Sequence, residues 1–322
     1  TRLINLLHFS TMIASKAARS VLAAPGKLLV DFGLSRAHGA EAGLLAARAA
    51  YAAGFSGSAT VLAAPCFGVP IYGTMAHSFV QAHDDEAAAF EHFARSFPGN
   101  AVLLIDTYDT EAAARKAVAL APRLAADGIA IKGVRLDSGD LASHARKVRQ
   151  ILDQGGLEKT VIFASGNLDE YRLKALLDSG APIDGFGVGT SLVTSGDAPS
   201  LDSVYKLMEY AGRPRRKRSE GKATWPGRKQ VYRRYGPDGR MREDLMTIEA
   251  DAQEGDALIQ PLMTAGRRLV PPPGLAEIRA RALRQYALLP EPLKSLDTAA
   301  AYSVVVSDAL RRLAAEVDRL QA

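Results

Sequence analysis

The middle of the chain alternates short apolar runs with longer stretches whose apolar residues recur at helical spacing. Each apolar run is typical of a buried strand, and the stretch after it predicts an amphipathic helix. The strands are predicted at 101–105, 128–134, 160–164 and 185–188, and the helices at 111–124, 141–152 and 168–178. A regular repeat of strand and helix predicts a parallel sheet, most simply an α/β barrel.

The first hundred residues follow the same alternation less regularly. Residues 3–22 predict a helix that stops before Pro25 and Gly26, and residues 27–33 predict a strand that ends in Asp-Phe-Gly. Further helices are predicted at 40–53, 78–83 and 86–96, and short strands at 58–63 and 69–72.

The repeat stops after Ser191. Two strands, 203–210 and 229–235, are predicted on either side of a basic loop, and Pro271 to Pro273 mark a linker before the closing helices 274–289 and 299–320. We therefore divide the chain into a helix of an amino-terminal or second domain at 1–25, a barrel core with the active site at 26–200, a basic β-rich segment at 201–270, and closing helices at 271–322.

Composition narrows the class of protein. The 322 residues are 48% hydrophobic and 23% charged, as in a globular protein with a sizeable core. Cys66 is the single cysteine, which excludes a disulfide framework within the chain and favours a reducing, cytoplasmic location. No apolar stretch approaches the roughly 20 residues of a membrane span, so we expect no membrane partner.

The net charge of +5 is concentrated in one segment. Residues 200–245 contain 13 Lys and Arg against 6 Asp and Glu. Such a surplus favours polyanionic partners, either nucleic acid or phosphorylated small molecules. The run Arg213–Arg218 could be a nucleic-acid patch or a solvated loop, but it lacks interleaved aromatic residues, so we expect no nucleic-acid partner.

Polar and small residues gather where the predicted strands end. The stretch GVRLDSGDL, residues 133–141, places a guanidinium, a hydroxyl and two carboxylates between a strand and a helix. In α/β folds, ligands bind at the carboxyl ends of the strands, which a barrel gathers onto one rim. Similar junctions between a strand and the next helix, called corners below, are predicted at 106–110, 165–167 and 187–191. An alternative holds at each corner, because Asp or Ser at a helix start can simply cap the helix.

These corners suggest two kinds of ligand. Four carboxylates could together hold Mg²⁺ and ribose hydroxyls, because Mg²⁺ prefers oxygen ligands and partners phosphates. They are Asp106, Asp109, Asp137 and Asp140. The glycine-rich corner from Gly187 to Ser191 offers backbone N–H groups to a phosphate, although a tight turn explains the same pattern. His77 follows another predicted strand and is either structural or catalytic.

The motifs together resemble the nicotinate phosphoribosyltransferases, which are type II phosphoribosyltransferases. The resemblance covers nearly the whole chain in one consistent order. It rests on DFGLSRAHG (31–39), GTMAHSFV (73–80), LIDTYDT (104–110), GVRLDSGDL (133–141), SGNLDE (165–170), FGVGTSLV (186–193), VYKLMEYAGRPRRKRSEGK (204–222) and PGRKQVYR (226–233).

This resemblance implies an irregular TIM-like α/β barrel with remnants of a second, α+β domain. It implies that nicotinate and phosphoribosyl pyrophosphate react to give nicotinate mononucleotide and pyrophosphate, coupled to ATP hydrolysis. It also implies Mg²⁺, ATP as a co-substrate, and a homodimer with shared sites.

The resemblance also implies roles for single residues. His77 matches the histidine that ATP phosphorylates, Phe32 matches an aromatic residue that stacks on the pyridine ring, and Arg135 and Asp137 match positions that contact substrate and ribose phosphate. The other expected substrate-binding residues are Arg36, Ser138, Asp140, Ser165, Gly166, Asn167, Gly187, Gly189 and Thr190. Asp137 and Asp140 are the expected metal ligands.

Two departures leave alternatives open. Ser35 stands where the family has an arginine that helps to bind the pyridine carboxylate, so either Arg36 compensates or affinity for nicotinate falls. The family also has a longer amino-terminal segment, so we expect part of that domain to be missing here. The alternatives are therefore nicotinamide as the substrate, or a catalytically impaired chain that only binds phosphoribosyl ligands.

Overall fold

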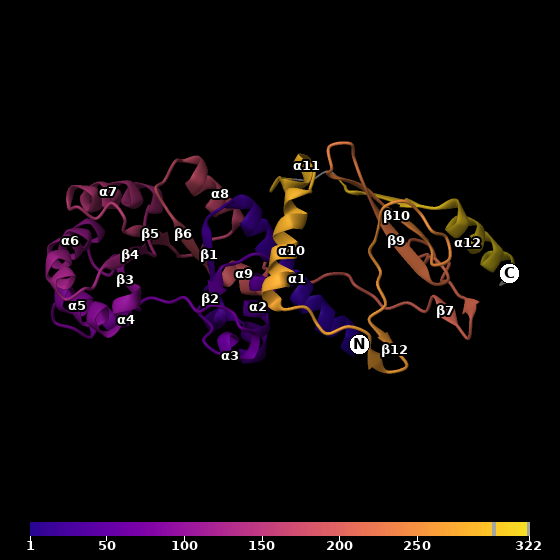
Figure 1. Cartoon of the computed structure of the whole chain (residues 1–322), viewed down its shortest axis with the longest axis horizontal. Coiled ribbons are helices and arrows are strands. Elements are labelled where there is room, and N and C mark those ends of the chain that lie inside the picture. Colours follow the sequence, from indigo (N-terminus) through magenta and orange to yellow (C-terminus); the bar gives the residue numbers. More distant parts are fainter. Residues whose placement is uncertain (298–300, 321–322) are drawn as a thin grey trace. The chain divides into compact units, whose positions relative to one another are not determined.

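The computed structural model describes residues 1–297 and 301–320 (Figure 1). The chain divides into two compact units. The first contains Leu6–Leu201 and Leu275–Ala282, and the second contains Thr1–Asn5, Asp202–Gly274 and Leu283–Ala322. Helix α1 (Arg2–Ala23) and helix α10 (Leu275–Ala287) have residues in both. The segment 26–200 lies within the first unit.

The first unit is built on a six-stranded parallel sheet in the order β2-β1-β6-β5-β4-β3. Its strands are β1 (Leu28–Asp31), β2 (Gly57–Ser58), β3 (Ala101–Leu104), β4 (Ile131–Leu136), β5 (Val161–Ala164) and β6 (Gly185–Val188). All neighbours in the sheet pair in parallel. Because β6 returns to β1, the sheet is a half-barrel, which confirms the predicted TIM-like α/β class.

Helices connect the strands, and Figure 1 shows α5 to α7 lying outside β3 to β5. The helices of this unit, besides α1 and α10, are α2 (Ala40–Ala52), α3 (Ala63–Phe67), α4 (His77–Gln81), α5 (Glu86–Ser96), α6 (Thr110–Ala126), α7 (Leu141–Gln154), α8 (Glu170–Asp178) and α9 (Thr190–Thr194). Two short 3₁₀ turns are η1 (Leu34–Arg36) and η2 (Pro98–Asn100).

An aspartate caps the amino end of each helix from α5 to α8. The carboxylates accept hydrogen bonds from the backbone N–H groups three residues further on. The capping residues are Asp85, Asp109, Asp140 and Asp169. Capping satisfies N–H groups that a helix leaves without partners, so each of these helices starts at a defined residue, and α6 to α8 each follow a strand. This fixes the corners at which the site residues lie.

The strands of the repeat carry the core of the first unit. Leu103, Leu104 and Leu136 are fully buried, as are Ile162 and Phe186 on the neighbouring strands. Strands that are covered on both faces have near-continuous apolar sequences, which is why these runs predicted parallel strands correctly. Within the described ranges, no helix has the length and apolar character needed to cross a membrane.

The second unit has a four-stranded sheet in the order β11-β9-β10-β14. Its strands are β9 (Lys229–Tyr235), β10 (Met241–Ile248), β11 (Asp256–Ala257) and β14 (Ser303–Val306). Two small hairpins pair β7 (Glu209–Tyr210) with β8 (Arg213–Pro214), and β12 (Met263–Thr264) with β13 (Arg267–Arg268). The helices α11 (Glu291–Lys294) and α12 (Asp308–Leu320) complete it.

The basic run takes part in the packing of this unit. Nη1 of Arg216 lies 3.2 Å from Oδ2 of Asp318 on α12, and the guanidinium carbon lies 5.9 Å from the ring centroid of Trp225. Arg311 approaches the same ring at 6.0 Å. Part of the positive charge at 213–218 is therefore paired within the unit, through Arg216.

The predicted strand at 58–63 is wrong beyond its first residue. Ser58 donates its hydroxyl to buried Asp31 and accepts the backbone N–H of Thr60, so the chain turns and α3 follows. The predicted strand at 69–72 reduces to an isolated bridge at Ile71. The bond between Ser58 and Asp31 and the bridge between Ser58 and Ile71 join separate segments of the chain, so a local sequence pattern does not predict them.

Two predictions in the second unit also need correction. The strand expected at 203–210 is limited to β7. The helix expected at 299–320 begins only at Asp308, because the run Ser-Val-Val-Val pairs in parallel with β10 as strand β14. β-Branched residues favour strands, so the prediction of a continuous helix through 303–306 is wrong. The start of that prediction, at 299–300, lies outside the described residues.

Candidate active site

Arg135, near the end of β4, is the best-connected side chain of the candidate site. Its Nη2 lies 2.9 Å from Oδ1 of Asp137, its Nε lies 2.9 Å from Oγ of Ser165, and its Nη1 lies 2.7 Å from Oγ1 of Thr74. A planar guanidinium bonded to three side-chain oxygens, and to the Met75 main-chain oxygen at 3.3 Å, has one defined orientation. The sequence predicted Arg135, Asp137 and Ser165, and the structure brings them together; it did not predict Thr74.

Asp137 is held as an anion. Burial acts to raise the pKa of its carboxyl group, but the hydroxyl of Ser165 and the guanidinium of Arg135 lower the pKa below its usual range. His77 adds to the lowering, since Nε2 lies 3.7 Å from Oδ2 of Asp137. A carboxylate with donors on one side therefore stays ionised at neutral pH.

Asp106 holds the loop that follows β4. Its Oδ2 accepts the backbone N–H of Asp137 at 2.9 Å and the hydroxyl of Ser138 at 2.6 Å. The second oxygen, Oδ1, is buried and has no hydrogen-bond partner within the described part of the chain. Asp106 thus fixes Asp137 and Ser138 relative to the end of the neighbouring strand β3.

Phe32 and Arg135 both line a cavity of about 560 Å³. The guanidinium carbon lies 5.4 Å from the ring centroid of Phe32, within the range of a cation–π contact. Gly187 makes room for this ring, because a Cβ there would lie 2.6 Å from Phe32. The other lining residues are Leu34, Ser35, Ala59, Val61, Ile71, Tyr72, Gly73, Thr74, Met75, Ala76 and His77.

The turn after β1 decides which side chain reaches this cavity. Asp31 is buried and accepts the backbone N–H of Gly33 and the hydroxyl of Ser58; burial raises the pKa of its carboxyl group. Ser35 lies on the cavity wall, whereas Arg36 is exposed and is absent from the lining. The residue that departs from the family pattern is therefore the one that contacts the cavity.

The loop from Ser165 to Asn167 presents backbone to the same region. Gly166 has φ +97° and Asn167 has φ +48°, a conformation that favours glycine and asparagine. At the end of β6, Gly189 approaches Phe32, since a Cβ on it would lie 3.1 Å from the Phe32 main-chain oxygen, and Thr190 begins α9. The predicted phosphate-binding corners therefore flank the residues that line the cavity.

The two predicted metal ligands make other contacts in the structure. Asp140 uses its carboxylate to cap α7, and Asp137 is paired with Arg135. Within residues 1–297 and 301–320, no three His, Cys, Asp or Glu side chains converge as metal ligands do. Mg²⁺ is commonly held by one or two carboxylates together with substrate phosphates, so a site of that kind needs no such cluster.

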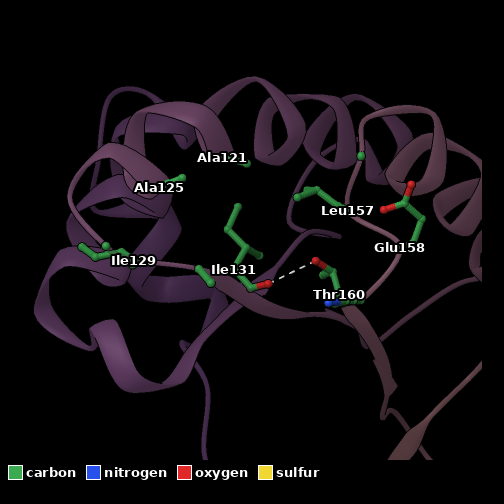
Figure 2. A pocket seen from close by; sticks show the side chains of 11 residues that line it. Ala121, Ala125, Ile129, Ile131, Leu157, Glu158 and Thr160 are labelled. Atoms are coloured by element: carbon green, nitrogen blue, oxygen red, sulfur yellow. Dashed lines mark hydrogen bonds between the residues drawn. The ribbon is translucent and has the colours of Figure 1, made fainter.

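A second cavity, of about 550 Å³, lies at the other end of β4 (Figure 2). Ile131, the first residue of that strand, and Leu157 line it, together with Ala121 and Ala125 of α6. The Thr160 hydroxyl donates to the main-chain oxygen of Ile131 at 3.1 Å. This lining contains none of the predicted site residues, so the cavity beside Phe32 is the candidate active site.

Comparison with known proteins gives the family of the chain. A sequence profile of the nicotinate phosphoribosyltransferase (NAPRTase) family matches residues 28–220, and one of the nicotinate phosphoribosyltransferase C-terminal domain matches residues 250–314. The chain belongs to the nicotinate phosphoribosyltransferase family. Among curated family members, it is 48% identical to nicotinate phosphoribosyltransferase pncB2 of Mycobacterium tuberculosis, over all of this chain and 68% of that protein. It is 33% identical to the enzyme of Bos taurus, over all of this chain and 74% of that protein.

Solved structures give the same family fold. Human nicotinic acid phosphoribosyltransferase superposes with a TM-score of 0.84 at 29% identity, over 99% of this chain and 76% of that one. Nicotinate-nucleotide pyrophosphorylase from Pyrococcus furiosus superposes with a TM-score of 0.75 at 29% identity, over 88% and 72%. Part of each relative therefore has no counterpart in this chain.

Proposed function

We propose that the chain is a nicotinate phosphoribosyltransferase of NAD salvage. It transfers the phosphoribosyl group of phosphoribosyl pyrophosphate to nicotinate and releases nicotinate mononucleotide and pyrophosphate. The observation that carries the proposal is the cavity in which the ring of Phe32 lies beside Arg135, with His77 on the same wall and Asp137 bonded to Arg135. An aromatic face, a fixed cation and an ionised carboxylate are what this reaction needs.

The pyridine ring of nicotinate would stack on Phe32. Arg135 already lies 5.4 Å from that ring, so its positive charge is available to the carboxylate of the base. Because three side chains hold the guanidinium in place, little reorganisation is needed when the substrate binds. This arrangement orients the ring nitrogen for attack on C1′ of the sugar.

The transfer step breaks the bond between C1′ and the pyrophosphate oxygen as the ring nitrogen forms its bond to C1′. Positive charge develops on the sugar, and an ionised Asp137 would stabilise it. The backbone N–H groups around Gly166 and Gly189 are the proposed cradle for the 5′-phosphate. Mg²⁺ would enter with the pyrophosphate of the substrate and neutralise the departing anion.

ATP is the proposed co-substrate, and His77 is the proposed acceptor of its γ-phosphoryl group. His77 lines the cavity and its side chain is 39% exposed, so it is accessible to a ligand. A phosphohistidine next to the pyrophosphate site would link ATP hydrolysis to turnover. The proposed homodimer, with sites shared between subunits, comes from the family resemblance.

Nicotinamide is the second candidate substrate, and the position of Ser35 favours it. Ser35 gives a neutral hydroxyl on the cavity wall where the family supplies a cation, and a neutral carboxamide needs no cation.

An assay of the purified protein decides between the two bases. Each base is offered with phosphoribosyl pyrophosphate and Mg²⁺, and the mass of the mononucleotide shows which one has reacted. We expect the nicotinate product, and we expect Phe32→Leu to raise KM for the base. Product from nicotinamide alone would favour the second candidate.

A further inference from the structure

Asp31 is a buried carboxyl group that the proposed reaction does not use. The residue is 1% exposed, and its carboxylate oxygens accept the backbone N–H of Gly33 at 2.8 Å and the hydroxyl of Ser58 at 2.7 Å. Among the described residues it has no cationic partner, and burial raises the pKa of the carboxyl group. Burying such a group is costly, so this position is explained by its two hydrogen bonds rather than by a gain in stability.

Ser58 connects Asp31 to the chain beyond β2. It is fully buried, and its side-chain oxygen accepts the backbone N–H of Thr60 at 2.9 Å while its hydroxyl donates to Asp31. An N–H group can only donate, so the Ser58 oxygen is an acceptor toward Thr60. The bond between Asp31 and Ser58 joins the same two side chains whichever of them supplies its proton. The connection therefore does not depend on the protonation state of the carboxyl group.

The residues joined in this way belong to the walls of the cavity. Apart from the arginine of β4, the residues that line it come from three stretches, 32–35, 59–61 and 71–77. The side chain of Ser58 reaches the second stretch directly and the first stretch through the carboxyl group. Its main-chain oxygen accepts the N–H of Tyr72, in the third stretch, at 3.1 Å. Ser58 is therefore a common point of contact for the three stretches.

We propose that Asp31 and Ser58 are positioning residues that hold these three stretches at the separation that fits the pyridine ring. The inference rests on the proposed function, which assigns the cavity to the base. Phe32, the residue that would stack on the ring, lies directly between Asp31 and the N–H group that bonds to it, so its main chain cannot rotate freely. Asp31 and Ser58 are outside the lining, so they act on the base through Phe32 and its neighbours.

The two substrates distinguish this role from a general effect on folding. A displaced wall weakens binding of nicotinate, whereas the proposed cradle for phosphoribosyl pyrophosphate lies on the loops after β5 and β6. Weaker binding of the base raises its KM. Partial unfolding instead lowers the concentration of active protein, which reduces the apparent kcat and leaves both KM values unchanged.

Two variants weaken the connection, and a third is the matched control. Ser58→Ala removes the hydroxyl, and Asp31→Asn replaces one of the two acceptor oxygens by an NH₂ group. Thr160→Val is the control, because Thr160 is 3% exposed and its hydroxyl bonds to the main-chain oxygen of Ile131, away from this cavity. Asp31→Asn decides the question if Ser58→Ala does not fold.

Two measurements are made on each variant that thermal unfolding shows to be folded. Initial rates of mononucleotide formation, with Mg²⁺ and ATP present, give kcat and a KM for each substrate. Hydrogen exchange with mass spectrometry follows peptides that cover 28–36 and 57–67. It reports how firmly the first two stretches are held, and it requires no activity.

We expect Ser58→Ala and Asp31→Asn to raise KM for nicotinate about tenfold, to leave KM for phosphoribosyl pyrophosphate within about twofold of wild type, and to speed exchange in both peptides. Thr160→Val is expected to change none of these. An unchanged KM for nicotinate, or an equal rise in KM for both substrates, would overturn the proposal. If wild-type protein forms no mononucleotide but the two variants still speed exchange in both peptides, the proposed function fails, while the coupling of the stretches by Asp31 and Ser58 stands. If exchange is unchanged as well, both fail.

Discussion

The main-chain oxygen of Asp137 lies 1.9 Å from the position that a Cβ on Gly166 would occupy. No side chain fits at that distance, so the loop after β5 packs its bare backbone against the residue that carries the site's carboxylate. Gly166 is also at φ +97°, which favours glycine. The close approach lets Ser165 reach the Asp137 carboxylate.

Gly166→Ala is expected to displace Asp137 and to destabilise the fold. The clash adds to the backbone cost of a positive φ, and overpacking of this kind costs about 1–3 kcal/mol. Gly180→Ala is the matched control, because Gly180 has φ +67° with no atom within 4 Å of a Cβ. Urea unfolding of both variants measures the difference. Equal losses of stability would show that the contact with Asp137 is unimportant.

Arg135→Lys is expected to reduce kcat/KM by at least about tenfold, since a lysine keeps the charge but cannot serve Asp137, Ser165 and Thr74 in one plane. The assay is formation of the mononucleotide. Arg146→Lys is the control, because Arg146 bonds to the Ser179 carbonyl away from the cavity. Similar activity of both variants would contradict the role given to the guanidinium.

Ser35→Arg is expected to lower KM for nicotinate by about tenfold relative to nicotinamide, because it adds a cation to the cavity wall. Arg36→Ala is expected to change neither value, since Arg36 is exposed and outside the lining. Steady-state kinetics with both bases measure this. A rise in KM for nicotinate in the alanine variant would show that Arg36 compensates for Ser35.

Lys16 joins α1 to the start of α8. Its Nζ lies 3.0 Å from Oε1 of Glu170 and 2.7 Å from Oδ1 of Asp197, and the Lys16 and Glu170 side chains are 6% and 0% exposed. Lys16→Met leaves the buried Glu170 carboxylate with Arg19 as its remaining charged partner, so it is expected to destabilise by about 3 kcal/mol, the low end for a broken buried pair. Lys174→Met removes an exposed ion pair and is expected to cost less than about 1 kcal/mol. Equal urea midpoints for Lys16→Met and Lys174→Met would contradict the expected difference between a buried and an exposed ion pair.

The free energy of unfolding is expected to depend on pH through the ionisation of the Asp137 carboxyl group. The pKa of its carboxyl group is lowered in the folded chain by Ser165 and Arg135, against the opposing effect of burial. The stabilisation is therefore fully present above the unfolded pKa of about 3.9 and is lost as pH falls through the lower folded value. Unfolding free energies of wild type and Asp137→Asn should converge in that acidic range. A constant difference at all pH values would contradict the lowered pKa.

The strands β3 to β6 and the polar residues at their carboxyl ends could be predicted from the sequence. Buried parallel strands leave continuous apolar runs, and the topology then brings Arg135, Asp137 and Ser165 to one edge of the sheet. The motif DFG placed Phe32 correctly at the end of β1. These features depend on local pattern and on one rule of topology.

The contacts of Thr74 and Thr107 could not be predicted in this way. Each hydroxyl reaches a partner on another segment, Arg135 or His77, and no spacing in the sequence records that approach. Likewise, Asp140 lies only three residues after Asp137 in the same loop, yet its carboxylate caps α7. Which of the two nearby carboxylates bonds to Arg135 depends on the loop conformation, in which Asp106 accepts the backbone N–H of Asp137.

The most direct test of the central claim is the formation of nicotinate mononucleotide from nicotinate and phosphoribosyl pyrophosphate, with Mg²⁺, with and without ATP, by the wild type and His77→Ala. The account predicts that wild-type protein forms the mononucleotide and that ATP stimulates it, while His77→Ala retains a slower reaction that ATP does not change. No mononucleotide from folded wild-type protein under any of these conditions would contradict the proposed function. ATP stimulation that survives in His77→Ala would contradict the role of the histidine.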